Sequence, residues 1–330
     1  MKAGKVERST LKNTILEQIT HHRNDVLVGA GIGEDSAVVD FGENSLVISS
    51  DPITGAADNA GFLAVNVACN DLISNGAIAV GIEVVLLLPE KFTEENTISL
   101  MKEIDQSAKK LNVEILGGHT EVLDLVRAPI IVVTAIGKVK KGEHLSSANA
   151  KAGDDIVLSK GAGIEGTYIL ANDHANTLKK NNVDQSIIEV AKTYKSKLSV
   201  IKEGKIAKEY GVNAMHDVTE GGVYGAMREM AEAANLGFEL NKVNVIINKE
   251  TKVITEALEI DPLALISSGS LLISTQNGKN LVEKLKNEGI KASLIGKFKV
   301  SNDYFLKENG KVKSLDEKNK DELWNFLEKT

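Results

Sequence analysis

The sequence has little cysteine, proline or aromatic character. Its 330 residues include one cysteine, four prolines and one tryptophan, and aromatic residues make up 4% of the chain. The single Cys69 excludes an internal disulfide and a cysteine-based zinc site, and it favours a reducing cytoplasm. The longest apolar stretch, residues 77–88, contains Glu83 and is too short for a membrane span, which needs about 20 apolar residues.

Charge and the start of the chain exclude further classes. Lys and Arg total 39 against 46 Asp and Glu, a net charge of −7, whereas proteins that coat nucleic acid are usually basic. Residues 1–8 lead into no apolar run, so no signal peptide is expected. We therefore expect a cytoplasmic protein whose partners are neither nucleic acid nor a membrane.

What is present is an ordinary globular composition, with 42% apolar and 26% charged residues. At about 100–200 residues per domain, the length predicts two domains. Helical and strand patterns alternate in both halves, which indicates a mixed α/β or α+β fold. A polar stretch over 138–155 predicts the boundary near residue 150, giving domains 1–150 and 151–330.

Acidic residues beside glycines form the first candidate site, Gly31-Ile32-Gly33-Glu34-Asp35-Ser36-Ala37. The glycines permit close approach to a phosphate, but two carboxylates would repel it unless a divalent cation lay between them. The alternative is a hairpin loop with solvated acids. Asp51, directly after the strand pattern of 46–50, is a second candidate, and its alternative is a carboxylate that caps a loop.

A polar stripe marks the helix predicted over 62–75. Asn66, Asn70 and Ser74 share one face, with Asp71 beside them. Residues 61–76 contain no Lys, Arg or Glu, although a solvated helix face usually carries long charged side chains. The stripe therefore predicts a buried polar site.

Two further motifs combine glycine with polar side chains. Gly117-Gly118-His119-Thr120-Glu121 follows the strand pattern of 113–116 and is expected to be a ligand-holding loop. His216-Asp217-Val218-Thr219-Glu220-Gly221-Gly222 runs into a predicted helix. Thr219 can cap that helix, and Gly221 and Gly222 leave its first amides open to an anion. Alternatively, this is an ordinary capped helix start with acids in its first turn.

A dinucleotide-binding turn is suggested by Gly161-Ala162-Gly163-Ile164-Glu165-Gly166, which spells G-x-G-x-x-G. That motif requires a strand, a helix and then a second strand that ends in an acid. After Gly166 the pattern continues from helix into helix, so a nicotinamide or flavin site is not expected. No G-x-x-x-x-G-K-[ST] motif is present.

Taken in order, these motifs resemble the aminoimidazole ribonucleotide (AIR) synthetase superfamily. The resemblance rests on Gly31 to Ala37, Asp51, Asn70-Asp71-Leu72 with Gly76-Ala77, Gly117 to Thr120 and Asp217 to Gly222, and it covers nearly the whole chain. The superfamily includes the purine enzyme itself, thiamine-monophosphate kinase, selenophosphate synthetase and the hydrogenase maturation protein HypE.

The resemblance implies a two-domain subunit. The N-terminal domain would complete a β-barrel across a homodimer, and the C-terminal domain would be an α/β sandwich. ATP and Mg²⁺ would lie in the cleft between domains. The implied metal ligands are Glu34, Asp35, Asp51, Asp71 and Asp217. The implied ATP contacts are Gly31, Gly33, Ser36, Asn70, Gly117, Gly118, Thr120, Thr219, Gly221 and Gly222, and the candidate acid–base residues are His119, Glu121 and His216.

The implied chemistry is transfer of the ATP γ-phosphoryl group to an oxygen, often of an amide, on a small molecule or a partner protein. The chain departs from each named member. It has no C-terminal cysteine, which HypE uses, and none in residues 1–30, where selenophosphate synthetase has a reactive one. His119 stands where the kinase and HypE have Asp. The sequence therefore indicates a HypE-like relative, with AIR synthetase or small-molecule kinase activity as alternatives. A non-catalytic ATP-binding scaffold or sensor is an alternative of another class.

Overall fold

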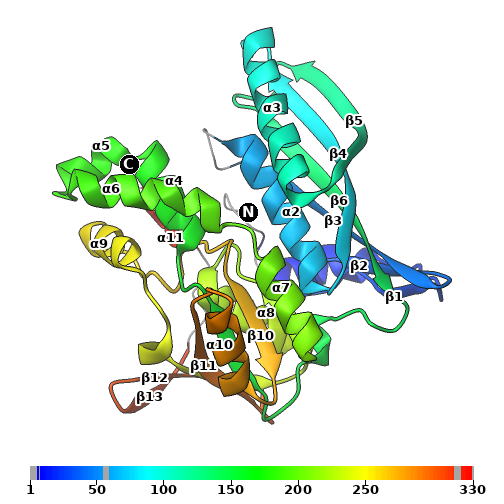
Figure 1. The fold of residues 1–330 in the computed structure, drawn as a ribbon, viewed down its shortest axis with the longest axis vertical. Coiled ribbons are helices and arrows are strands. Elements are labelled where there is room, and N and C mark those ends of the chain that lie inside the picture. The colour runs from blue at the N-terminus through cyan, green and yellow to red at the C-terminus, as the bar shows by residue number, and fades with distance from the viewer. Residues whose placement is uncertain (1–5, 7, 55–58, 316–320, 329–330) are drawn as a thin grey trace.

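The computed structural model describes residues 6, 8–54, 59–315 and 321–328. The outer limits of the two predicted domains, and most of the N-terminal segment searched for a signal peptide, lie outside these ranges. Within them the chain forms two mixed sheets and a helical cluster (Figure 1). None of the helices in the described ranges is long and apolar enough to cross a membrane.

The first sheet has six strands in the order β1-β2-β3-β6-β4-β5. Its strands are β1 (Val26–Val28), β2 (Ala37–Phe41), β3 (Asn44–Ile53), β4 (Ile78–Pro89), β5 (Glu114–Leu123) and β6 (Ile130–Lys140). All neighbours are antiparallel except β4 and β5. Strands β2 and β3 pair as a hairpin.

Two helices, α2 (Ala60–Ser74) and α3 (Glu94–Leu111), pack on this sheet (Figure 1). The Thr93 hydroxyl accepts a hydrogen bond from the amide of Asn96, which makes Thr93 the N-cap of α3. Gly76 has a φ of 71°, and its amide donates a hydrogen bond to the carbonyl of Ile73, which closes the C-terminal end of α2.

The opposite face of this sheet carries apolar side chains that are only half-buried. We call it the open face, and its residues are Val39, Leu46, Ile48, Val85, Leu87, Ile130, Val132 and Ile136. On β6 they alternate with Ile131, Val133 and Ala135, which are completely buried under α2. In one copy of the chain the sheet is therefore covered on one side.

The second sheet has seven strands in the order β13-β12-β9-β11-β7-β10-β8. They are β7 (Asp155–Ser159), β8 (Ala214–Asp217), β9 (Gly237–Asn241), β10 (Leu271–Thr275), β11 (Ala292–Lys299), β12 (Tyr304–Glu308) and β13 (Lys311–Ser314). Helix α8 (Gly222–Ala233) packs against Ile156 and Leu158 on one face. On the other face α7 (Ile201–Tyr210) and α10 (Gly278–Asn287) cover Val157.

The remaining helices form a cluster beside the second sheet, to the left in Figure 1. They are α4 (Ile164–Asp173), α5 (Ala175–Lys180), α6 (Gln185–Lys192), α9 (Lys249–Ala257) and α11 (Glu322–Leu327). Before β1, residues 8–18 form three short helical pieces, α1 (Arg8–Thr10), η1 (Leu11–Ile15) and η2 (Leu16–Gln18). Short 3₁₀ turns are η3 (Ser147–Asn149), η4 (Thr193–Lys197) and η5 (Lys242–Asn244).

Candidate functional site

A cleft of about 470 Å³ lies between the first sheet with α2 and the second sheet with its helices. The first part of the chain contributes Glu34, Asp35, Asp51, Pro52, Ile53, Thr54, Val67 and Asp71. The second part contributes Glu165, His216, Asp217, Thr219, Glu220, Ile266, Ser268 and Trp324. All five carboxylates that the sequence nominated as metal ligands therefore lie in one cleft.

The five nominated carboxylates come from the ends of two strands, from one helix and from one loop. Asp51 is near the end of β3, and Asp71 is in the buried polar stripe of α2. Asp217 is the last residue of β8. Glu34 and Asp35 lie in the loop before β2, where the Ser146 hydroxyl donates a 2.6 Å hydrogen bond to Glu34 Oε1.

The carboxylates are close enough to raise the pKa of a neighbouring carboxyl group. The pKa of Asp71 is raised well above its usual range, by burial and then by the charges of Asp51, Asp217 and Asp35. Burial likewise raises the pKa of Glu34. A cluster of this kind is costly when every member is ionised, and a bound cation removes that cost.

His216 is buried between two carboxylates. Its Nδ1 contacts Asp35 Oδ1, and its Nε2 lies 3.2 Å from Glu229 Oε2 in α8. Burial alone lowers the pKa of His216, but Asp35 and then Glu229 raise it well above its ordinary value. The imidazolium thus links the loop before β2 to β8 and α8. With both nitrogens engaged, His216 is placed to orient Asp35.

The donor set suits a hard divalent cation. Carboxylate oxygens of Asp35 and Asp217 lie within 4.8 Å of one another and of a ring nitrogen of His216, which contacts Asp35 and Glu229 rather than a cation. One oxygen of Asp51 and one of Glu34 are buried without a hydrogen-bond partner. Carboxylate oxygens are the ligands that Mg²⁺ prefers, so these residues fit the metal implied by the sequence.

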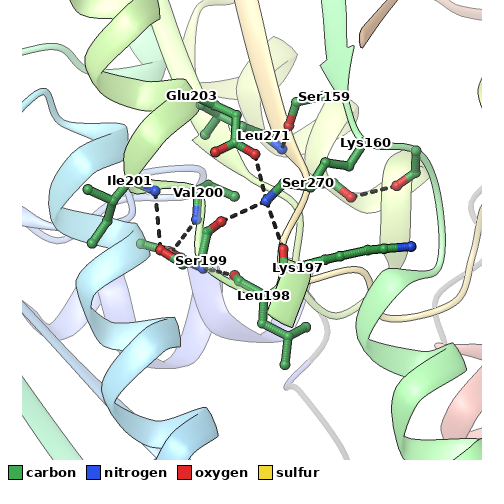
Figure 2. Close-up of polar contacts among 12 residues, drawn as sticks. Ser159, Lys160, Lys197, Leu198, Ser199, Val200, Ile201, Glu203, Ser270 and Leu271 are labelled. Carbon is green, nitrogen blue, oxygen red and sulfur yellow. Dashed lines mark hydrogen bonds and ion pairs between the residues drawn. The ribbon is translucent and has the colours of Figure 1, made fainter. Parts of the chain in front are cut away.

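Asn70, nominated as an ATP contact, does not line the cleft. It is completely buried, its amide nitrogen donates to the carbonyl of Leu198 at 2.8 Å, and its amide oxygen accepts from the nitrogen of Val200 at 2.9 Å. The same segment is fixed from the other side by Lys160 (Figure 2). The Lys160 ammonium donates to the carbonyls of Lys197 and Ser199 and pairs with Glu203 at 2.6 Å.

The glycines before β2 also lie outside the cleft lining. Gly33 has a φ of 77°, and a Cβ there would lie 2.2 Å from the carbonyl oxygen of Glu229 in α8. Gly33 is therefore required where this loop meets α8. Gly31 is exposed, and Ser36 is buried outside the cleft lining.

The segment Gly117 to Glu121 is not a loop, which corrects the sequence prediction. It lies within the exposed edge strand β5, where a Cβ on Gly118 would lie 1.8 Å from the carbonyl oxygen of Val84. Gly118 thus allows β4 and β5 to approach. His119 and Glu121 are solvent-exposed, with 3.7 Å between His119 Nε2 and Glu121 Oε2. In one copy of the chain, none of Gly117, Gly118, His119, Thr120 and Glu121 lines the cleft.

The start of α8 is occupied by the chain itself. The amide of Gly221 donates a 2.6 Å hydrogen bond to Asp321 Oδ2, and the amide of Gly222 donates to the carbonyl of Thr219. The expected open anion site is therefore filled by a carboxylate from the C-terminal region. Thr219 lines the cleft but does not cap the helix, whose N-cap is Gly221.

Several cleft residues were not nominated from the sequence. Glu165 is in the first turn of α4, within the motif examined only for dinucleotide binding. Trp324, the single tryptophan, comes from a tail that shows little pattern. Two features of the sequence could have indicated these residues. Glu165 is a charged residue among apolar ones at a helix start, and Trp324 is a lone tryptophan in a polar segment.

Comparison with known proteins shows the family of the chain. The model of the AIR synthase related protein N-terminal domain matches residues 33–139, and that of the C-terminal domain matches 151–308. A putative hydrogenase expression/formation protein of Methanocaldococcus jannaschii is 29% identical over 306 residues, spanning 89% of this chain and 88% of the relative. The carbamoyl dehydratase HypE of Bradyrhizobium diazoefficiens is 25% identical, spanning 73% and 69%.

Solved structures share the fold. The hydrogenase maturation protein HypE in complex with ATP aligns with a TM-score of 0.71 at 18% identity, covering 98% of this chain and 97% of that one. AaThiL complexed with AMPPCP and TMP aligns with a TM-score of 0.73 at 19% identity, covering 94% and 96%. Both resemble this chain in its two-domain arrangement. The resemblance drawn from the motifs is confirmed: the chain belongs to the AIR synthase-related family.

Proposed function

We propose that the cleft binds ATP with divalent cations and transfers the γ-phosphoryl group to an oxygen of an acceptor, as an ATP-dependent enzyme distantly similar to HypE. The observation that carries the proposal is the meeting of Asp35, Asp51, Asp71 and Asp217 from both parts of the chain. Relatives with this fold have been solved with ATP and with AMPPCP. The hydrogenase-maturation names of the relatives fit an acceptor that is a small molecule or a group on a partner protein.

The proposed roles follow from placement. Glu34, Asp35, Asp51, Asp71 and Asp217 hold the cations, which would neutralise charge on the phosphates. His216 keeps Asp35 in place through its two contacts. Thr219 faces the nucleotide from the second part of the chain. Catalysis of phosphoryl transfer consists mainly of positioning and charge neutralisation, so no nucleophilic side chain is needed. Cys69 is buried in α2, and burial raises the pKa of its thiol to about 12.

We also propose a homodimer formed through the open face. A half-buried apolar sheet face is stabilised when a second copy covers it. Gly117, Gly118, His119, Thr120 and Glu121 do not line the cleft of their own chain. If they contact nucleotide or take part in proton transfer, the dimer must bring them to a cleft.

Substitution of two acids tests the metal assignment. Asp51→Asn and Asp71→Asn each remove one charge and keep the side-chain shape. We expect each to weaken Mg²⁺-dependent AMPPCP binding by about tenfold or more, measured by calorimetry. Asp105→Asn, on the exposed side of α3, is the matched control and should leave affinity unchanged. Wild-type affinity in both cleft variants at low Mg²⁺ would overturn the assignment.

A further inference from the structure

One carboxyl group in the cleft is separate from the proposed cation cluster. Glu165 begins α4, is only 4% exposed, and lines the cleft from the second part of the chain. Ser268 donates hydrogen bonds to its carboxyl group. Its oxygen Oε2 is buried without a hydrogen-bond partner. A buried oxygen in this state is unfavourable, so it marks a place where a ligand can donate a hydrogen bond.

The electrostatic neighbours of Glu165 differ from those of the cation cluster. The pKa of Asp71 is raised by the charges of Asp51, Asp217 and Asp35, whereas the charge that raises the pKa of Glu165 is that of Glu220. Burial and then Glu220 raise the pKa of Glu165 to about 7, while the bonds from Ser268 oppose the shift. The cleft therefore has two acidic regions, one suited to cations and phosphates and one beside Ser268.

The region beside Ser268 is unsuited to a second anion. Among the described residues that line the cleft there is no Lys or Arg, and Glu220 adds a further negative charge. A phosphate or carboxylate placed against Glu165 would therefore meet like charge in a buried site. Ile266 and Trp324 also line the cleft and offer apolar surface, and the carbonyl of Ile266 accepts a hydrogen bond from the amide of Gly166, next to Glu165.

Resting on the proposed function, we propose that Glu165 is a specificity-determining residue of the acceptor subsite. It admits an acceptor that carries N–H donors and no negative charge, and it rejects anionic acceptors. An N–H donor satisfies Glu165 Oε2 when the carboxyl group is ionised. When the group is protonated, its O–H can donate to a carbonyl of the same ligand. Glu165 thus selects the acceptor, while the cation cluster selects the nucleotide.

A matched pair of probes tests this selectivity. Benzamide and benzoate have the same ring, but one carries N–H donors and the other a negative charge. Trp324 is the single tryptophan and lines the cleft, so its fluorescence reports binding there. Both probes are titrated into the full chain at about pH 8, where Glu165 is ionised. Each titration is made with and without Mg²⁺–AMPPCP, whose own binding tests the proposed function separately.

We expect benzamide to bind at least about tenfold more tightly than benzoate. Glu165→Gln, which keeps the side-chain size, should reduce this preference at least about fivefold by admitting benzoate. Glu288→Gln, an exposed site, should leave the preference unchanged. Equal binding of the two probes, no benzamide binding, or an unaltered preference in Glu165→Gln would overturn the inference. A preference that persists without nucleotide binding would keep the inference and contradict only the ATP site.

Discussion

At the scale of single residues, the site depends on buried charges that have specific partners. Lys160 illustrates this, because its ammonium meets two carbonyls and Glu203 in a site that is almost closed to solvent (Figure 2). These contacts hold residues 197–199, and the neighbouring Leu198 and Val200 hold Asn70 beside Asp71. Lys160 therefore supports α2 from outside the cleft.

Removal of the Lys160 charge should be costly. Lys160→Met leaves Glu203 buried and uncompensated, and we expect a loss of about 3–5 kcal/mol in the free energy of unfolding, measured by urea denaturation. Lys109→Met breaks the exposed pair with Asp105 and should cost less than about 1 kcal/mol. Similar losses in the two variants would show that the Lys160 contacts contribute little.

Glu165 should make stability depend on pH. Its pKa of about 7 in the folded chain exceeds the ordinary value of 4.5, so the folded state binds more protons between these values. The contribution of Glu165 therefore falls as pH rises through this window. Relative to wild type, Glu165→Gln should gain up to about 3 kcal/mol of stability between about pH 4.5 and pH 8. A difference between the two unfolding curves that stays constant with pH would contradict this.

At the scale of elements, the loop before β2 is positioned by its contact with α8. Gly33 approaches the backbone at Glu229, and two residues later Asp35 meets His216. Backbone packing and the ion pair therefore fix the same loop. This explains why a glycine pattern that suggests phosphate binding in the sequence serves, in this structure, the packing of one part of the chain on the other.

A pair of alanine substitutions separates this contact from simple backbone strain. Gly33 and Gly42 have similar φ values of 77° and 84°, but a Cβ on Gly42 would meet nothing within 4 Å. Both variants carry the conformational cost, and only Gly33→Ala carries the clash. We expect Gly33→Ala to lose about 2 kcal/mol more than Gly42→Ala in chemical denaturation. Equal losses would mean that the loop accommodates the added methyl group.

How much of the site could be predicted from the sequence differs from one element to another. The acids at Glu34, Asp35, Asp51, Asp71 and Asp217 could be placed together, because each stands at a strand end, a loop or an uncharged helix face. The sequence predicts a loop for Gly117 to Glu121, and this is wrong because a solvent-exposed edge strand lacks the alternation of apolar and polar residues that indicates a strand. The anion at the start of α8 could not be foreseen, since Asp321 is distant in sequence.

At the scale of the whole molecule, the open face is an apolar surface that a single copy of the chain leaves only half-buried. Half-buried apolar residues run across β2, β3, β6 and β4, and a stable interface buries about 800 Å² on each partner. We therefore expect the wild-type chain to sediment as a dimer in analytical ultracentrifugation. Val132→Glu, at the centre of the face, should give a monomer.

A control distinguishes the open face from other exposed apolar residues. Val190 on α6 is 45% exposed and far from the first sheet, so Val190→Glu should remain dimeric. A monomeric wild type, or a dimer that persists in Val132→Glu, would refute the proposed interface. In the latter case another surface would have to join the copies.

The central claim is that acids from both parts of the chain form one cation-dependent nucleotide site. Calorimetric titration of the intact protein with ATP, with and without Mg²⁺, tests it most directly. We expect a dissociation constant of about micromolar order with Mg²⁺ and binding at least about a hundredfold weaker without it. Absence of binding in both conditions, or equal affinity in both, would contradict it.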